Sequence, residues 1–412
     1  MLKAELLEII KNGENSGVEF KRDDLRPEQL AKEIVAFANF EGGKVLLGVE
    51  DDGTITSIQR PDLESWVMNV FTDHIHPIIM PYYEEIALEN NQRIAVITVL
   101  QGTSKPYVLR HHGREEIYIR IGSTSRLATR EQQARLFASG GLLHPELLPV
   151  SGTHFENMDI ARLKDYLANL VGDPEMPVSQ NEWEIRLQGL GFMEQREDSP
   201  AVCTIAGLVL FGRAPRRYLR QAGIRWMAFS GNDKEYQALD DTFLDGPLVA
   251  LCEGKANGGR QIIEPGLIER TLDRINPFIS TESNSIDETM RRYRVWHYPL
   301  EVIREALLNA LVHRDWTRAL EVEIINYADR LEIISPGALQ NSMTIDKMLA
   351  GQRSPRNPII VEVMRDYSYI DARGMGVRRK IVPLMREQVG REPIFAATSD
   401  YLQITLPRAT KS

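Results

Sequence analysis

The sequence has few cysteines, no long apolar run and no excess of positive charge, and each absence excludes a class of protein. Its 412 residues include only two cysteines, Cys203 and Cys252. Two thiols cannot form a disulfide framework or a cysteine-rich zinc cluster, so we expect buried thiols and a reducing compartment. The apolar run that comes nearest to a membrane span, Ile205 to Phe211, is strand-sized and falls well short of the roughly 18 residues required. The sequence therefore predicts no membrane span.

The net charge is negative. There are 49 lysine and arginine residues against 58 aspartate and glutamate residues, which gives a formal charge of −9. The molecule as a whole therefore repels phosphate, and any binding of nucleic acid must come from a local basic surface.

The composition is that of a globular protein with more than one domain. Hydrophobic residues make up 43% and charged residues 26% of the chain, and its length predicts two to three domains of roughly 150 residues each. Residues 1–11 mix leucine and isoleucine with glutamate, which is typical of an amphipathic helix rather than a secretory signal. We therefore expect a cytoplasmic protein.

Helical and extended patterns alternate along the chain, with apolar residues spaced for helices or alternating as in strands. Residues 1–140 predict one α+β domain, with helices over 1–11 and 27–39 and strands over 17–21, 44–49, 93–99 and 116–121. Residues 141–200 predict a linker followed by a small helical segment, with helices over 159–171 and 180–190. Residues 201–412 predict a second large domain with strands over 202–211, 224–229, 322–327, 331–335 and 401–406 and a long helix that begins at Pro299.

Carboxylates cluster around a lysine near the N-terminus. Glu14 and Glu19 stand five positions apart, Lys21 follows, and Asp51 and Asp52 come directly after a predicted strand. Carboxylates hold divalent cations, and a cation with a nearby lysine can stabilise the charge that develops during phosphodiester cleavage. The alternative is an amphipathic strand that points Phe20 inward and its charges into solvent. The pattern by itself leaves both open.

A local basic stretch lies in the same domain. Between residues 105 and 130 there are six basic residues against two acidic ones, with two tyrosines interleaved. Arginine beside aromatic rings suits phosphate contact and base stacking, whereas the alternative is a solvated face of strands and turns. The candidate nucleic-acid contacts are Lys105, Arg110, Arg114, Arg120, Arg126 and Arg130.

A line of polar residues crosses the apolar helix that begins at Pro299. Glu305, Asn309 and His313 recur every four positions and therefore share one face. A carboxylate can orient water, and an amide oxygen can complete a magnesium shell beside a nucleotide phosphate. The alternative is an exposed face on which Glu305 pairs with Arg304 or Arg314.

Motifs in the first 130 residues resemble the Schlafen-type, Alba-like domain. They are Glu19-Phe20-Lys21, Ala36-Phe37-Ala38-Asn39, Gly42-Gly43, residues 46–53 and residues 118–123. The resemblance implies a nucleic-acid-binding α+β fold that occurs in bacterial regulators and in the ribonuclease core of Schlafen proteins. In the nuclease members two glutamates five residues apart and a later aspartate form the active centre. Glu14, Glu19 and Asp51 or Asp52 match that pattern, with Lys21 as an electrostatic helper and Glu14, Glu19 and Asp51 as metal ligands.

Motifs in the last third resemble the divergent GHKL-like ATP-binding domain, an α/β sandwich. They are residues 304–315, 329–333, Ser335-Pro336-Gly337, Arg356-Asn357-Pro358 and Gly374-Met375-Gly376. Such domains often follow a Schlafen-type domain in bacterial transcriptional regulators, some of them labelled RecG-like helicases. The resemblance implies ATP with Mg²⁺, or Mn²⁺, as the ligand.

The same resemblance implies roles for single residues. Glu305 would orient water, Asn309 would bind the metal, and the loop of Gly374 and Gly376 would approach the phosphates. His313 and Gly337 are further candidate nucleotide contacts. Gly337 stands where the family has an Asp-x-Gly segment, so the adenine-binding carboxylate is missing there, and Asp371 could substitute for it. This departure favours nucleotide binding over efficient turnover.

Together these patterns predict a nucleic-acid-binding, nucleotide-sensing protein that acts as a transcriptional regulator. We expect it to bind DNA or RNA and to form a homo-oligomer. The alternative from another class is a Schlafen-like, metal-dependent nuclease gated by ATP, with a role in phage defence. A third reading is an assembly protein with a decayed ATP fold.

Overall fold

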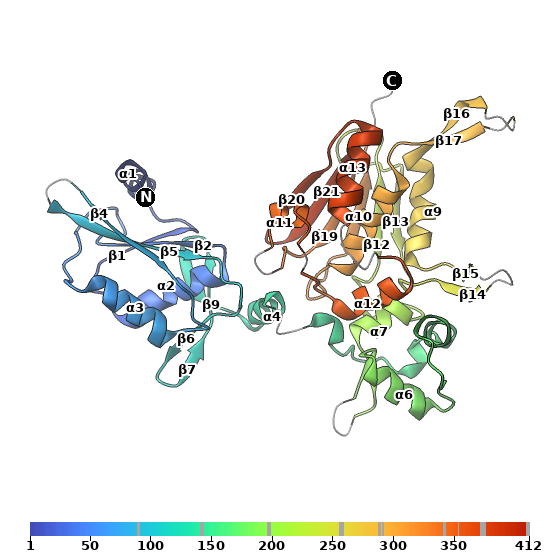
Figure 1. The fold of residues 1–412 in the computed structure, drawn as a ribbon, viewed down its shortest axis with the longest axis horizontal. Coiled ribbons are helices and arrows are strands. Elements are labelled where there is room, and N and C mark those ends of the chain that lie inside the picture. The colour runs from blue at the N-terminus through green and yellow to red at the C-terminus, as the bar shows by residue number, and fades with distance from the viewer. Residues whose placement is uncertain are drawn as a thin grey trace. The chain divides into compact units, whose positions relative to one another are not determined.

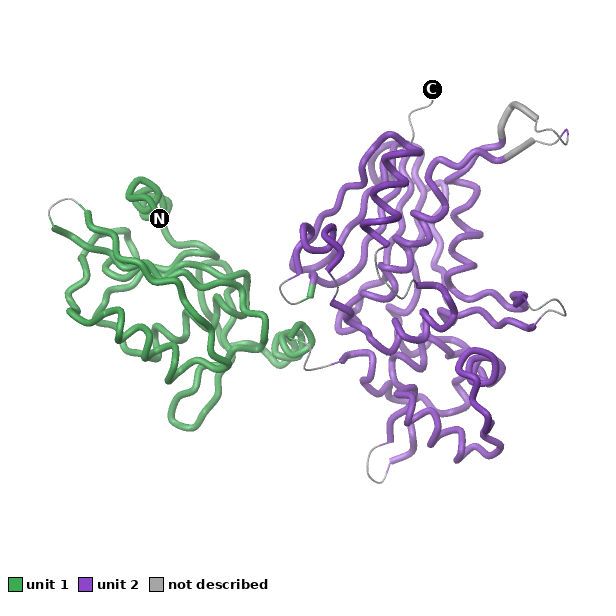
Figure 2. Tube along the Cα trace, in the orientation of Figure 1, with its two compact units in different colours: residues 1–143, 340–342 green, residues 144–339, 343–412 purple. Residues whose placement is uncertain are grey.

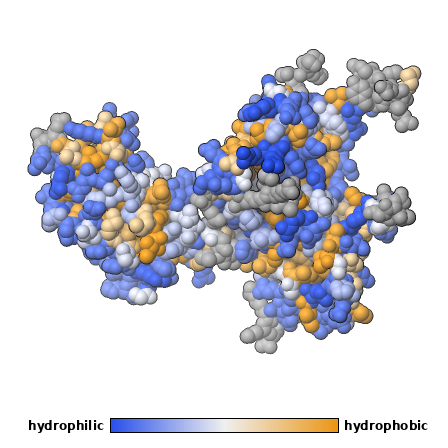
Figure 3. Space-filling model, in the orientation of Figure 1, coloured by the Kyte–Doolittle hydropathy of each residue, from blue (hydrophilic) through white to orange (hydrophobic). Residues whose placement is uncertain are grey.

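The protein, described as a computed structural model, divides into two compact units (Figure 2). The first contains residues 1–143 and 340–342, and the second contains residues 144–339 and 343–412. The structure describes residues 1–88, 91–140, 144–195, 199–254, 259–286, 290, 292–340, 343–352, 354–370 and 376–408. Hydrophilic residues cover most of the visible face of each unit (Figure 3). Among the described residues, no helix has the length and apolar character needed to cross a membrane.

The first unit is a four-stranded sheet with helices on both faces (Figure 1). The strand order is β1-β2-β5-β4, in which β1 runs parallel to β2 and the other pairs are antiparallel. Alternate residues of β2 point to opposite faces: Val45 and Leu47 pack with α2 and α3, and Leu46 packs with Leu6 of α1. The elements of this unit are α1 (Lys3–Asn12), β1 (Val18–Lys21), α2 (Pro27–Asn39), β2 (Gly42–Leu47), α3 (Leu63–His74), β3 (Ile75–His76), β4 (Tyr82–Ala87), β5 (Arg93–Leu100), β6 (Val108–His111), β7 (Arg114–Glu116), β8 (Tyr118–Ile121), β9 (Thr124–Leu127) and α4 (Arg130–Ser139).

The entry of the chain into β2 depends on a glycine. A Cβ at Gly43 would lie 2.3 Å from the Phe37 ring of α2 and 2.9 Å from the carbonyl oxygen of Gly17. Only glycine at position 43 lets the Phe37 ring and the backbone of Gly17 approach β2 this closely. The predicted helices and strands of this unit are confirmed, with ends that differ by a few residues.

The second unit is a six-stranded sheet covered by helices on one face (Figure 1). Its order is β13-β12-β18-β19-β21-β20, and the β12–β18 pair is the parallel one. Ile324, Ile333 and Leu406 of the sheet share one apolar core with Ile275 and Val302 of the helices α9 and α10. The predicted α/β sandwich is confirmed, including the hairpin β18–β19 and the last strand β21.

The helices of this unit are η2 (Pro145–Leu147), η3 (Phe155–Asn157), α5 (Ile160–Asp165), η4 (Tyr166–Val171), α6 (Gln180–Gly189), α7 (Ile205–Phe211), α8 (Pro215–Tyr218), α9 (Leu267–Ile279), α10 (Leu300–Val312), α11 (Ile345–Leu349), α12 (Pro358–Asp366), η5 (Val377–Ile381), α13 (Val382–Leu384) and η6 (Met385–Val389). Its strands are β10 (Met193–Glu194), β11 (Val202–Cys203), β12 (Ile224–Ala228), β13 (Asp240–Leu244), β14 (Leu251–Gly254), β15 (Arg260–Glu264), β16 (Ser280–Ile286), β17 (Arg292–Trp296), β18 (Val322–Asn326), β19 (Arg330–Pro336), β20 (Ile394–Ala397) and β21 (Tyr401–Pro407). The segment predicted as a linker with helices contributes Leu163, Leu167 and Leu187 to the core of this unit.

The predicted strand over 202–211 is wrong, because most of that segment is the helix α7. The Oγ1 of Thr204 accepts a hydrogen bond of 3.1 Å from the N–H of Gly207 and so caps the first turn. All seven residues of α7 are buried. A helix buried on every side has no polar face, so its apolar run cannot be told from a strand by periodicity.

Gly207 is the position in α7 where a small change should be costly. A Cβ there would lie 2.1 Å from the carbonyl oxygen of Phe192, so α7 would have to move away from that backbone. We expect Gly207→Ala to lower the free energy of unfolding by about 1 to 3 kcal/mol, measured by urea unfolding. Gly189 in α6 is the matched control, because a Cβ there meets no atom within 4 Å. Gly189→Ala should raise stability by up to about 1 kcal/mol, and equal effects of the two changes would contradict the assigned packing.

Candidate functional site

Three carboxylates of the first unit converge on Lys21. The Nζ of Lys21 lies 2.7 Å from the Oε1 of Glu19, 3.6 Å from the Oδ1 of Asp51 and 3.9 Å from the Oε1 of Glu14. Glu14 is held in place because its Oε1 accepts a hydrogen bond of 2.8 Å from the N–H of Phe20 in β1. Burial lowers the pKa of Lys21, but the hydrogen bond to Glu19 and the three negative charges outweigh burial and raise it. Lys21 therefore remains charged and is the cation among these carboxylates.

Asp51, and not Asp52, is the aspartate that joins this cluster. Asp52 is exposed, and its Oδ1 accepts a hydrogen bond of 2.8 Å from the N–H of Thr54, which lowers the pKa of Asp52. The pKa of Glu14 is raised, mainly by burial. In the described part of the chain, no group of three or more His, Cys, Asp or Glu side chains is arranged to hold a metal ion. Metal binding by Glu14, Glu19 and Asp51 stays a prediction.

Arg120 has a structural position, so its prediction as a nucleic-acid contact is wrong. Its side chain is fully buried, and NH1 donates to the Oε2 of Glu19 at 2.7 Å and to the Oε2 of Glu33 at 3.1 Å. NH2 donates to the carbonyl oxygen of Asn15 at 2.8 Å, and the guanidinium lies 4.6 Å from the centroid of the Phe37 ring. Arg120 therefore ties β8 to β1 and α2 and cannot reach an external phosphate.

Lys105 is also turned inward, and its prediction as a phosphate contact is wrong for the same reason. It is 8% exposed, and its Nζ donates to the carbonyl oxygen of Phe40 at 2.9 Å. Burial lowers the pKa of Lys105 to about 8. The sequence pattern could not separate these two inward-facing residues from the other basic residues of the stretch.

The other four basic residues of the stretch are exposed. Arg110 pairs with Glu115 at 2.7 Å. Arg114, Arg126 and Arg130 form no ion pair with any residue that the structure describes. These arginines keep their full donor capacity for an external phosphate.

A cavity of about 550 Å³ lies at the hairpin of β6 and β7 and gathers imidazole rings beside Arg110 and Arg114. The Nδ1 of His74 lies 3.2 Å from the carbonyl oxygen of Arg110, and the Nδ1 of His111 lies 3.3 Å from the Oε1 of Glu28. The carbonyl oxygen of Arg110 can only accept, so in the neutral ring of His74 the Nδ1 carries the hydrogen. The ring of His112 lies 3.9 Å from that of His111, centroid to centroid. The cavity is lined by Asp73, His74, Arg110, His111, His112, Gly113, Arg114 and Glu115.

The three histidines of this cavity, His74, His111 and His112, were not among the predicted contacts. The adjacent pair His111-His112 inside the basic stretch was the available signal. His74 comes from the end of α3 and reaches the hairpin only through the pairing of β3 with β6. Imidazole rings can stack on bases while guanidinium groups contact phosphates.

In the second unit, α10 brings Glu305 and Asn309 together. Asn309 Nδ2 donates to the Oε1 of Glu305 at 3.3 Å, and the Nζ of Lys380 lies 3.8 Å from the Oε2 of Glu305. Glu305 is 8% exposed and pairs with Lys380 rather than with Arg304 or Arg314. Of the polar line, Glu305 is buried and contacts Lys380 of η5, Asn309 is half-buried and His313 is exposed.

Two observations support the fit of this group to a magnesium nucleotide. The amide N–H of Asn309 faces Glu305, which leaves its Oδ1 for a cation. A Cβ at Gly376 would lie 1.6 Å from the Oε1 of Glu305, so the backbone at Gly376 lies directly against that carboxylate. One amide oxygen from the protein suits Mg²⁺, which usually takes one or two protein ligands and completes its shell with phosphates and water.

His313 and Gly337 lie at the turn that follows α10. The His313 ring is exposed, yet burial among the surrounding atoms and the charge of Arg356 lower its pKa to about 4. The ring is therefore neutral at pH 7. Gly337 has a φ of +112°, and a Cβ there would lie 2.4 Å from the NH1 of Arg356 and 2.5 Å from the Cβ of Asp315. Arg356 and Asp315 form an ion pair of 3.0 Å.

Asn357 holds the end of α10. Its Nδ2 donates to the carbonyl oxygens of Val312 at 2.8 Å and Arg314 at 2.9 Å, one on each side of His313. Ser335 donates to the carbonyl oxygen of Ala310 at 2.9 Å. These donors satisfy carbonyl groups that have no partner within the helix, and they fix the direction of the turn.

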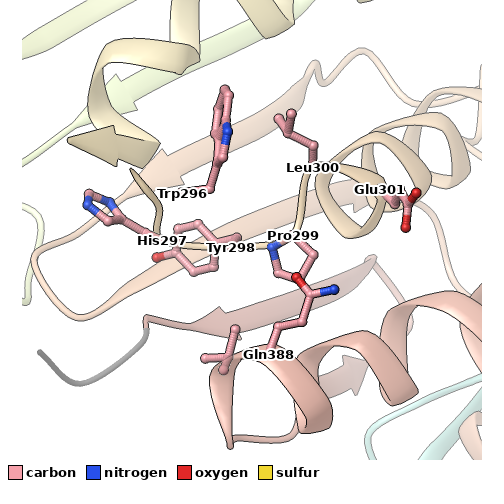
Figure 4. Close-up of a pocket in the computed structure, with 8 residues that line it drawn as sticks. Trp296, His297, Tyr298, Pro299, Leu300, Glu301 and Gln388 are labelled. Atoms are coloured by element: carbon pink, nitrogen blue, oxygen red, sulfur yellow. The ribbon is translucent and has the colours of Figure 1, made fainter. Parts of the chain in front are cut away.

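Two predicted nucleotide contacts, Asp371 and Gly374, lie outside the described residues. Lys380, Arg356 and Asn357 lie beside the candidate nucleotide residues but were not predicted as contacts. The basic run 378–380 after the glycine loop was the available sequence signal for Lys380. A separate cavity of about 340 Å³ lies at the first turn of α10 and contains none of the predicted residues (Figure 4). It is lined by Trp296, His297, Tyr298, Pro299, Leu300, Glu301, Gln388 and Val389.

Comparisons with known families cover parts of both units. Residues 14–129 match the family described as "Schlafen, AlbA_2", and residues 320–406 match the family described as "Putative ATP-dependent DNA helicase recG C-terminal". The chain therefore carries a Schlafen/AlbA_2 domain followed by a RecG-like C-terminal domain. This pair of domains indicates a nucleic-acid-related, ATP-binding protein. The second match begins after α10, so Glu305 and Asn309 lie outside it.

The solved structures that are similar to the chain include two bacterial proteins. The DIP2311 protein from Corynebacterium diphtheriae is 19% identical, with 98% of this chain and 80% of that chain covered and a TM-score of 0.43. The N-terminal domain of a RecG-related protein, described as a putative ATP-dependent DNA helicase, from Nitrosomonas europaea is 23% identical, with 31% of this chain and 95% of that chain covered and a TM-score of 0.25. No curated protein matches the chain.

Removing the buried guanidinium of Arg120 should destabilise the first unit. Arg120→Met leaves the carboxylates of Glu19 and Glu33 without that partner, and breaking a buried ion pair in this way costs about 3 to 5 kcal/mol. We expect urea unfolding of the first unit to move to a lower midpoint. Arg126→Ala removes an exposed arginine and should change stability by less than about 0.5 kcal/mol. Equal urea midpoints for Arg120→Met and Arg126→Ala would contradict the structural role assigned to Arg120.

Proposed function

We propose that the protein is a nucleic-acid-binding regulator whose second unit senses ATP. The observation that carries the proposal is the hairpin cavity of β6 and β7, where Arg114 pairs with no described acidic residue and lies beside the rings of His111 and His112. The chain has a formal charge of −9, so a phosphate needs a local cation, and Arg114 would supply one at this cavity. Phosphate contact by arginine and base stacking on imidazole would together hold a single strand or an exposed base.

For the second unit we propose that Asn309, Lys380 and the backbone of Gly376 hold a magnesium nucleotide. Bound Mg²⁺ would supply positive charge that offsets the charge of the phosphates. The Oδ1 of Asn309 would hold the metal, and the ammonium of Lys380 would turn from Glu305 to a phosphate oxygen. Glu305 would orient water, but both of its oxygens already face Asn309 or Lys380. This engagement supports binding and sensing rather than fast turnover.

Cleavage of nucleic acid remains the alternative prediction. The convergence of Glu14, Glu19 and Asp51 would favour it, but Lys21 already supplies the positive charge there. A divalent cation would have to displace the ammonium of Lys21 from three carboxylates. We therefore base the proposed function on binding.

The nucleic-acid interface can be tested at Arg114 and Arg126. Each lost phosphate contact should flatten the slope of log affinity against log salt by about 0.7 for single strands and 0.9 for duplexes. We expect Arg114→Ala to weaken binding and flatten this slope, measured by fluorescence anisotropy with labelled single-stranded and duplex DNA and with RNA, and Arg126→Ala to add to the effect. Arg93→Ala is the control, because Arg93 is exposed and paired with Glu85 at 3.0 Å. An unchanged slope for Arg114→Ala would remove the hairpin from the interface.

The nucleotide site can be tested at Asn309 and Lys380 by calorimetry with magnesium and a non-hydrolysable ATP analogue. Loss of one hydrogen bond to a charged group costs about 1.5 to 3 kcal/mol, so we expect Asn309→Ala and Lys380→Ala each to weaken binding about 10- to 100-fold. Arg379→Ala is the matched control for Lys380, because Arg379 is its exposed neighbour. The proposal fails if the wild type gives no heat at millimolar nucleotide, or if Arg379→Ala has the same effect as Lys380→Ala.

A further inference from the structure

Glu146 is a buried carboxylate that the proposed function does not use. It belongs to η2, it is 0% exposed, and it forms no ion pair with any described residue. Its Oε1 accepts a hydrogen bond of 2.9 Å from the N–H of Ile359, and its Oε2 accepts one of 3.0 Å from the N–H of Ile360. Burial raises the pKa of Glu146 to about 7, against the opposing effect of the two N–H groups. A carboxylate in such a place needs a structural or functional reason.

The two N–H groups belong to the first turn of α12, where backbone donors have no partner within the helix. The residue just before a helix usually caps these donors with its own side chain, and asparagine is one of the preferred types. Asn357 stands at that position but forms no such cap. Its amide group instead donates to the carbonyl oxygens of Val312 and Arg314 at the end of α10.

Asn357 therefore serves the turn around His313, and Glu146, 213 positions earlier than Ile359 in the chain, caps α12 in its place. The neighbouring Arg356 pairs with Asp315 and lies against Gly337. Movement of the first turn of α12 would thus carry Arg356 and Asn357 with it, and with them the turn between α10 and β18.

We propose that Glu146 is a positioning residue of the nucleotide site: by capping α12 it frees Asn357 to hold the turn that carries His313. The inference rests on the proposed function, because the turn matters for binding only if the second unit takes a nucleotide there. Since η2 is the first helix of the second unit, the link joins the start of that unit to its nucleotide turn.

The test compares Glu146→Gln and Glu146→Ala with the wild type. Glutamine keeps the size of the side chain but places an NH₂ group against one of the two N–H donors, and alanine removes both acceptors. Loss of a residue that orients a binding group typically costs about 10- to 100-fold in affinity, so we expect Glu146→Gln to weaken binding of the magnesium ATP analogue about 10-fold and Glu146→Ala to weaken it further. Glu156→Gln is the matched control, since Glu156 is an exposed glutamate of the neighbouring short helix η3.

A pH profile separates positioning from a general loss of structure. A proton on Glu146 turns one acceptor into a donor, so the wild type should approach Glu146→Gln as the pH falls from 8 to 6, and the affinity ratio between them should shrink. His313, whose pKa is lowered to about 4, stays neutral over this range, and titration of the nucleotide affects both proteins alike and cancels in that ratio. A ratio of one at pH 8, with both proteins folded, would overturn the proposal.

Hydrogen exchange gives a readout that does not need the nucleotide. We expect Glu146→Gln to speed exchange of the amides at 359–360 and also at 313–315, while the amides of β18 and β19 stay protected. Faster exchange at 359–360 alone would overturn the proposal, because loss of the cap on α12 would then leave the turn around His313 unchanged. If the wild type binds no nucleotide but exchange spreads to 313–315, the proposed function fails while the link from Glu146 to the turn stands.

Discussion

Burying a charged or amide side chain costs free energy unless protein groups replace the water it loses, and in each unit one buried side chain gives most of its donors to distant protein groups. In the first unit Arg120 is fully buried and donates to Glu19, Glu33 and the backbone of Asn15. In the second unit Asn357 is fully buried and donates to two carbonyl oxygens at the end of α10. Each joins segments that are far apart in the chain, and each orients the candidate site beside it.

In the first unit some cationic side chains are paired inside the protein, and others remain exposed on the surface. Arg120 and Lys105 give their donors to the interior, and Lys21 gives its donors to the carboxylate cluster. The positive charge that remains for an external partner is carried by exposed arginines such as Arg114 and Arg126. The histidines of the hairpin cavity place imidazole rings beside Arg110 and Arg114. Net charge is therefore a poor guide to this surface, because what matters is which cations are left without an internal partner.

In the second unit, close contacts at two glycines hold the backbone of the candidate site in place. Glu305 lies against the backbone of Gly376, a contact that excludes any side chain at that glycine. Gly337 likewise leaves room for the pair of Arg356 and Asp315. Such contacts fix the backbone around Glu305 and at the turn after α10, and the low exposure of Glu305 limits the access of water to its carboxylate. If the proposed nucleotide binds here, this arrangement favours binding over rapid turnover.

The sequence by itself determined the elements whose pattern is local. Pro27 and the apolar spacing after it define α2, and the polar line of Glu305 and Asn309 on an apolar helix indicated a site before any fold was known. It also placed the basic stretch between Lys105 and Arg130. Where each side chain points was decided only by tertiary structure. Arg120 and Arg114 look alike in sequence, yet one is buried by the packing of β8 on α2 and the other is exposed on a hairpin. In the same way, α7 was mistaken for a strand, and Glu146 gave no signal at all. Burial and hydrogen-bond partners depend on residues up to 214 positions away, and no local pattern records which distant backbone group will need a donor or an acceptor.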